Sequence, residues 1–103
     1  MFAVVVYHQT TTGLLNDGSP ALDQASRAWI DYLASRPGFV EFLSLGNAGA
    51  DRVVAVSLWA SEADFRTGVA DPASNAARAG FAGLFTSLTP EFMNVLEYRR
   101  AEA

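Results

Sequence analysis

The chain has 103 residues, of which half are hydrophobic, and its formal net charge is −4. This length suits one domain spanning residues 1–103, and so hydrophobic a composition argues against disorder. The chain contains no cysteine and no lysine, which excludes disulfides, thiolate nucleophiles and Schiff-base chemistry on a lysine.

Three classes of partner are also disfavoured by composition. The arginines are scattered, with no basic run longer than Arg99-Arg100, so we expect no nucleic-acid binding. His8 is the single histidine and cannot build a multi-histidine metal site alone, so we expect no metal. No apolar run reaches membrane-spanning length and no cleavable leader is visible, so we expect a soluble, cytoplasmic protein without membrane contact.

The first half of the chain predicts a strand, a helix and a second strand. Residues 2–9 hold three consecutive valines and no breaker, which is typical of a strand. After a polar loop, Ser19-Pro20 is expected to cap a helix whose apolar stripe includes Trp29 and which ends near Arg36. Pro37-Gly38 then stops the helix, and residues 39–45 are expected to form the second strand.

The second half predicts a strand, an interrupted helix and a last strand. Residues 52–59 are β-branched and apolar, and the glycine-containing segment 46–51 before them suits a hairpin. Ser61 is expected to cap the next helix, with an acidic residue three positions later in a capping-box arrangement. Asp71-Pro72 should interrupt this helix, which we expect to resume and last to about Ser87.

With residues 91–100 as the last strand, the order of elements is strand, helix, strand, strand, helix, strand. This order predicts a ferredoxin-like α+β fold, βαββαβ, whose four-stranded antiparallel sheet carries both helices on one face. Alternation along the strands makes both faces of the sheet apolar, as when Val4 and Val6 alternate with Val5 and Tyr7. Because two helices cover only one face, we expect the other face to be covered by a second copy in a homodimer.

Residues 54–65 resemble the antibiotic biosynthesis monooxygenase family. Members often end their third strand with a Trp, here Trp59, followed by a short polar step and an acidic-Phe pair, here Asp64-Phe65. The stretch Arg36-Pro37-Gly38-Phe39 also resembles the family's entry to its second strand. The resemblance covers nearly the whole chain and implies a dimeric α+β barrel with one pocket per subunit, between sheet and helices.

The resemblance also implies a cofactor-independent monooxygenase that acts on a small polycyclic, anthrone-like aromatic. Such a substrate supplies its own electrons to oxygen once it is deprotonated, so the protein must bind a flat ring, remove a proton and stabilise an anion. Trp59 matches the family's Trp, whereas Ala55 and Phe65 stand where such members carry Asn and Tyr. The candidate catalytic residues are Trp59, His8 and Tyr7, and the candidate substrate-binding residues are Ala55, Ser57, Phe65, Phe81, Phe85, Arg78 and Asn94.

The fold implied by this resemblance also hosts two other functions. Similar proteins bind or degrade haem through a His on the second helix and an Asn on the first strand. Arg78 falls where that His would stand and the first strand has no Asn, so haem chemistry is not expected. The runner-up is a non-catalytic dimer that binds a small apolar or aromatic ligand among aromatic side chains such as Phe81 and Phe85.

Overall fold

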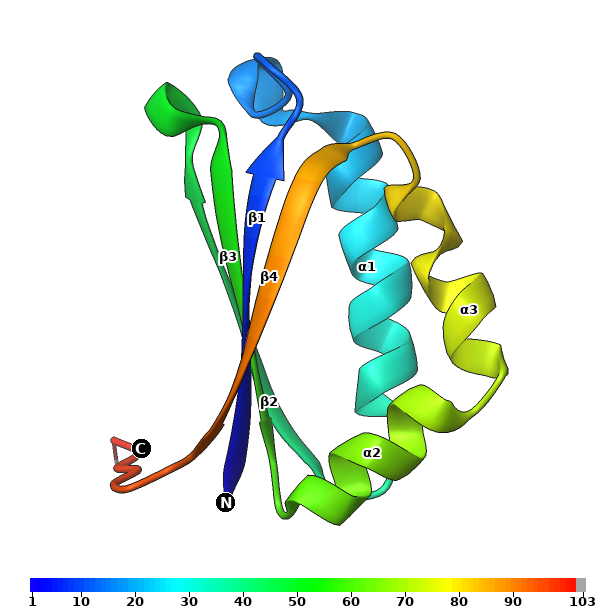
Figure 1. Cartoon of the computed structure of the whole chain (residues 1–103), viewed down its shortest axis with the longest axis vertical. Helices are drawn as coiled ribbons and strands as arrows, with labels where there is room; N and C mark the ends of the chain where they lie inside the picture. Colours follow the sequence, from blue (N-terminus) through cyan, green and yellow to red (C-terminus); the bar gives the residue numbers. More distant parts are fainter. Residues whose placement is uncertain (102–103) are drawn as a thin grey trace.

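The computed structural model describes residues 1–101, in which a twisted sheet carries all of its helices on one side (Figure 1). The predicted ferredoxin-like α+β fold is confirmed. None of the helices in this described range is long and apolar enough to cross a membrane. The elements are β1 (Phe2–Thr10), η1 (Asn16–Gly18), α1 (Pro20–Ala34), β2 (Phe39–Asn47), η2 (Ala48–Ala50), β3 (Arg52–Trp59), α2 (Glu62–Ala70), α3 (Ala73–Arg78), η3 (Ala79–Phe81) and β4 (Phe85–Asn94).

The four strands are antiparallel and lie in the order β2-β3-β1-β4. On the central strand β1, Val4 lies opposite Ser57 of β3 and Phe92 of β4, so these three side chains share one face. This face, which we call the inner face, points toward the helices (Figure 1). On β1, Val6 and His8 point to this inner face as well.

Helix α1 packs its apolar stripe on the inner face and begins with Pro20 at its first position. Within this stripe Ala25 and Leu33 are buried. The prediction that Ser19 caps the helix was wrong, because its side chain makes no capping bond and its φ of 35° is left-handed. The Ser19 hydroxyl is buried without a hydrogen-bond partner in the described chain.

Helix α2 begins as its sequence predicts, since the Ser61 hydroxyl accepts a hydrogen bond from the Asp64 N–H at 3.2 Å. The chain then turns at Asp71, whose carboxylate accepts from the N–H of Ala73 at the start of α3. The predicted interruption at this point is therefore confirmed.

The last strand lies earlier in the chain than predicted. The helical region ends at Phe81, not near residue 87, and β4 begins at Phe85, not at residue 91. Gly83, with a φ of +78°, allows the chain to reverse between these two aromatic residues. Pro90 lies within β4 and not before it, which is possible because β4 is an edge strand and can accommodate a proline.

The core lies between the inner face and α1 with α2, and its buried cluster is Phe2, Val4, Leu33, Trp59 and Phe65. The opposite, outer face of the sheet carries no helix (Figure 1). Large apolar side chains are exposed there, among them Tyr7, Leu43, Leu45 and Met93, each with two fifths or more of its surface in solvent.

Candidate functional site

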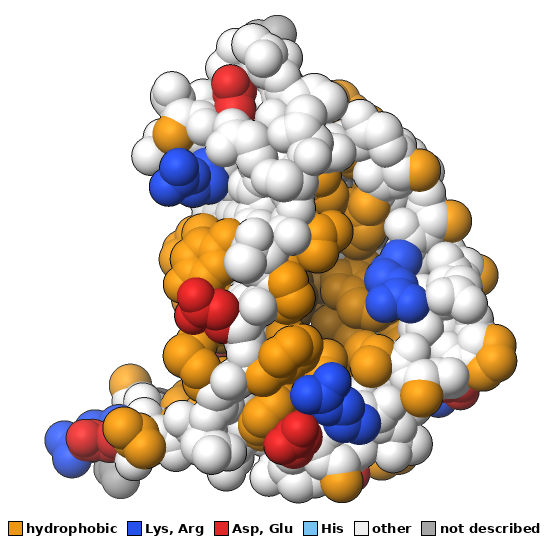
Figure 2. All heavy atoms as spheres, viewed as in Figure 1, with side chains coloured by type: hydrophobic (Ala, Val, Ile, Leu, Met, Phe, Trp, Pro, Cys, Tyr) orange, Lys and Arg blue, Asp and Glu red, His pale blue; other side chains and the backbone are white. Residues whose placement is uncertain are grey.

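A cavity of about 610 Å³ separates the inner face of the sheet from α1, α3 and η3. Figure 2 shows it as a hollow lined with hydrophobic side chains. The helices do not cover the inner face of β4, so Leu88 and Phe92 stay exposed although both line the cavity. The cavity therefore opens beside β4, and its volume and apolar lining suit a small, largely apolar molecule.

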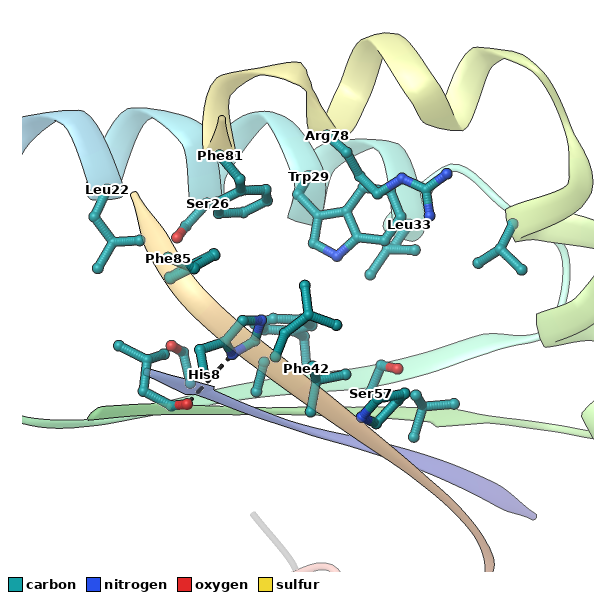
Figure 3. A pocket seen from close by; sticks show the side chains of 18 of the residues that line it. His8, Leu22, Ser26, Trp29, Leu33, Phe42, Ser57, Arg78, Phe81 and Phe85 are labelled. Carbon is teal, nitrogen blue, oxygen red and sulfur yellow. Dashed lines mark hydrogen bonds between the residues drawn. The ribbon is translucent and has the colours of Figure 1, made fainter. Parts of the chain in front are cut away.

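His8 is the titratable group on the floor of this cavity (Figure 3). Its ring lies 4.4 Å from that of Phe85, centroid to centroid, and its Nδ1 lies 3.3 Å from the carbonyl oxygen of Val53. Because a carbonyl oxygen only accepts, Nδ1 carries the proton in this bond and Nε2 keeps a lone pair. Burial lowers the pKa of His8 below its ordinary 6.5, so the ring is neutral at pH 7.

Arg78 supplies a positive charge on the helical side of the cavity. Its guanidinium donates hydrogen bonds to the Ser74 hydroxyl at 3.2 Å and to the Asn75 side chain at 3.0 Å. Among the carboxylates whose side chains the structure describes, none forms an ion pair with it, whereas Arg66 is paired with Glu62. The charge of Arg78 is thus held in place by neutral groups and remains available to an anion.

Trp29 of α1 also lines the helical side, or roof, of the cavity, and its ring nitrogen is directed into the cavity (Figure 3). The Arg78 guanidinium lies 5.4 Å from its ring centroid, within the range of a cation–π contact. The sequence placed Trp29 in an apolar helix stripe and gave no sign of this role. Ser26 of α1 and Ser44 of β2 also line the cavity and were not predicted.

In the part of the chain that the structure describes, no group of three His, Asp or Glu side chains gathers to hold a metal ion. The polar chemistry of the cavity therefore comes from His8, Arg78, Trp29 and a few serine hydroxyls.

A scan against protein-family models finds no match for this sequence, and a comparison with curated proteins finds none either. Solved structures do match. SnoaB from Streptomyces nogalater, described as a cofactor-independent oxygenase, has a TM-score of 0.79 at 15% identity over 94% of each chain. A Nitrosomonas europaea protein provisionally named an antibiotic biosynthesis monooxygenase has a TM-score of 0.75 at 18% identity, over 94% of this chain and all of its own.

This chain has the fold of the antibiotic biosynthesis monooxygenases. The same fold occurs in MhuD, solved as an R26S mutant with two manganese protoporphyrin IX molecules per active site. MhuD has a TM-score of 0.75 at 21% identity, over 98% of this chain and 100% of its own. The family resemblance drawn from residues 54–65 is thus confirmed at the level of the fold.

Within this monooxygenase fold, the sequence-predicted residues divide into two groups. Trp59 is wholly buried on the inner face against α2, outside the cavity lining, and its Nε1 donates a hydrogen bond to Ser57 at 3.0 Å. Tyr7 lies on the outer face, and Asn94 ends β4 outside the cavity lining. The structure therefore separates these three from the others, and those that do line the cavity are His8, Ala55, Ser57, Phe65, Arg78, Phe81 and Phe85.

Proposed function

We propose that the protein is a cofactor-independent monooxygenase that oxidises an anthrone-like polycyclic aromatic bound in this cavity. The proposal rests on His8, a neutral side chain on the floor of an aromatic-lined cavity. Its Nδ1 binds the Val53 carbonyl, which leaves the lone pair of Nε2 available. A neutral imidazole is the form that removes a proton, and burial, which lowers the pKa of His8, favours that form. The shared fold with SnoaB supports the reaction class.

In the proposed reaction, Nε2 of His8 takes a proton from the activated ring carbon of the substrate. The electron pair left behind delocalises onto the ring oxygen, and the positive charge of Arg78 favours this anion. The anion then adds O₂ at this carbon to give a peroxide, which takes up the proton held by His8. Loss of the carbon's second hydrogen as a proton breaks the O–O bond, so one oxygen stays as the new carbonyl and the other leaves as water. For anthrone the products are anthraquinone and water, so atoms and electrons balance without any other reductant.

We propose further that the outer face is covered by a second copy of the chain. Monomeric proteins rarely expose a wide apolar surface, and this face presents Tyr7, Leu43, Leu45 and Met93 to solvent. A two-fold axis through the face would set each apolar patch against its equivalent. This arrangement gives the homodimeric α+β barrel expected from the sequence.

The proposed activity is tested by oxygen uptake with 9-anthrone, after treatment of the protein with EDTA and without added flavin. We expect one O₂ consumed per anthrone and anthraquinone as product, at a rate well above that of anthrone in buffer. Uptake equal to the buffer rate would exclude this activity. If anthrone then still raised the melting temperature, the non-catalytic ligand-binding alternative would replace it.

A further inference from the structure

The two tryptophans of the chain have opposite surroundings. Trp59 has no exposed surface, and the Ser57 hydroxyl accepts the hydrogen bond from its indole N–H. The indole of Trp29 is only partly buried and directs its N–H into the cavity (Figure 3). None of the residues drawn in Figure 3 accepts a hydrogen bond from this nitrogen. Trp29 therefore presents a free donor to whatever fills the cavity.

The Trp29 ring is held in a fixed position by its neighbours. On α1 it stacks on Tyr32, with ring centroids 5.7 Å apart and planes 16° from parallel. The Tyr32 hydroxyl is itself fixed, since it donates to the carbonyl of Gly68 at 2.6 Å. A donor that is already oriented loses little entropy when it binds, which is the property that makes a fixed dipole effective toward a developing charge.

The neighbouring charge also suits this donor to an anion. Arg78 lies against the Trp29 ring and is anchored by Ser74 and Asn75, with no ion-paired carboxylate in the described chain. A positive charge beside an indole draws electron density from it and makes its N–H a stronger donor. The two groups together offer one directed hydrogen bond and one unpaired positive charge.

We propose that Trp29, and not Trp59, is the indole donor of this site, and that it binds the anionic oxygen of a flat aromatic enolate or phenolate. The enolate form of the ligand rests on the proposed function, whereas the donor assignment rests on geometry alone. Trp59 instead donates its N–H to Ser57 from its buried position in the core.

The test uses the two indole N–H resonances in a proton–nitrogen correlation spectrum of the ¹⁵N-labelled full chain. A Trp29→Phe variant identifies the resonances, because it removes only that of Trp29. The probe is alizarin red S, a water-soluble three-ring hydroxyquinone with phenolate and carbonyl oxygens. We expect the Trp29 resonance to move downfield on titration, as a newly formed hydrogen bond requires, and the Trp59 resonance to stay in place.

Binding constants supply a second readout, measured from the visible absorbance of the probe. Trp29→Phe should bind alizarin red S about tenfold more weakly, since it loses a hydrogen bond to a charged acceptor. The matched control is Tyr98→Phe, which removes a hydroxyl that donates to Glu41 outside the cavity lining and should leave the constant unchanged.

Movement of the Trp59 resonance alone, no movement of either at millimolar probe, or undiminished binding by Trp29→Phe would each overturn the assignment. The oxygen assay is independent of these results. Anthrone uptake without a Trp29 shift removes only this inference, and a Trp29 shift without anthrone uptake removes only the proposed reaction.

Discussion

The two faces of the sheet are both apolar, but for different reasons. The inner face places His8 and Ser57 among aliphatic and aromatic side chains around a cavity. The outer face around Val5, Val54 and Val56 has no helix above it, and its charged residue Glu91 lies opposite Val5 on the edge strand β4. Apolar alternation thus identifies which residues share a face, whereas polar residues that line a cavity distinguish the inner face as the candidate site.

The strongest test of this difference is to remove the titratable group of the inner face. His8→Gln keeps a side-chain donor for the Val53 carbonyl but has no lone-pair nitrogen, so the rate of anthrone oxidation should fall by about 10²–10⁴. In the unmodified protein the rate should fall as the pH drops through the lowered pKa of His8, with its midpoint below 6.5, because protonation removes the base. The variant should lose this pH dependence in an oxygen-electrode titration, and a retained profile would exclude His8 as the base.

The outer face is tested by placing a charge on it. Leu43→Asp should weaken self-association by roughly thirtyfold or more, since a central apolar contact at an interface contributes about 2 kcal/mol. Sedimentation equilibrium measures the effect. The matched control is Leu88→Asp, which charges a similarly exposed leucine on the inner face and should leave the association constant unchanged. An unmodified protein that stays monomeric at high concentration would contradict the proposed dimer.

The link between the inner face and the core is tested at Ser57. Ser57→Ala leaves the buried Trp59 N–H without its acceptor, which should lower the free energy of unfolding by about 1–3 kcal/mol. Ser57→Thr keeps the hydroxyl and should be less destabilising. Urea unfolding of the two variants provides the comparison, and equal stabilities would show that this hydrogen bond contributes little.

The smallest expected effect concerns the charge at the roof of the cavity. Arg78→Gln should raise the KM for an anionic aromatic about fivefold, because Arg78 is exposed and solvent weakens its attraction. Arg66→Gln is the control, since Arg66 is already paired with Glu62 and does not line the cavity. Equal KM changes in the two variants would indicate long-range attraction by net charge and no specific contact.

The sequence predicts most of the sheet but less of the site. Strand alternation predicts that Val53, Ala55, Ser57 and Trp59 share one face, as they do, and local spacing also predicts the Ser61 cap. The last strand was misplaced because Pro90 signals a break in isolation, and only the sheet order shows that β4 lies at an edge. Such information is tertiary and does not appear in a local pattern.

The same limit explains the two tryptophans. Trp59 fitted a family pattern, yet Phe39 and Phe65 pack edge-on against it and leave it no exposed surface. Trp29 looked like an ordinary member of a helix stripe. Its N–H reaches the cavity because the stripe extends beyond the well-packed core, over a part of the sheet that the helix does not touch closely.

The position of the cavity opening determines how substrate and oxygen enter and how product leaves. The opening lies along the free edge at β4, on the side away from the surface that a second copy would occupy. Reactant and oxygen could therefore enter, and product leave, while two subunits stay joined. In such a dimer each cavity would have its own opening to solvent, and turnover would not require the subunits to dissociate.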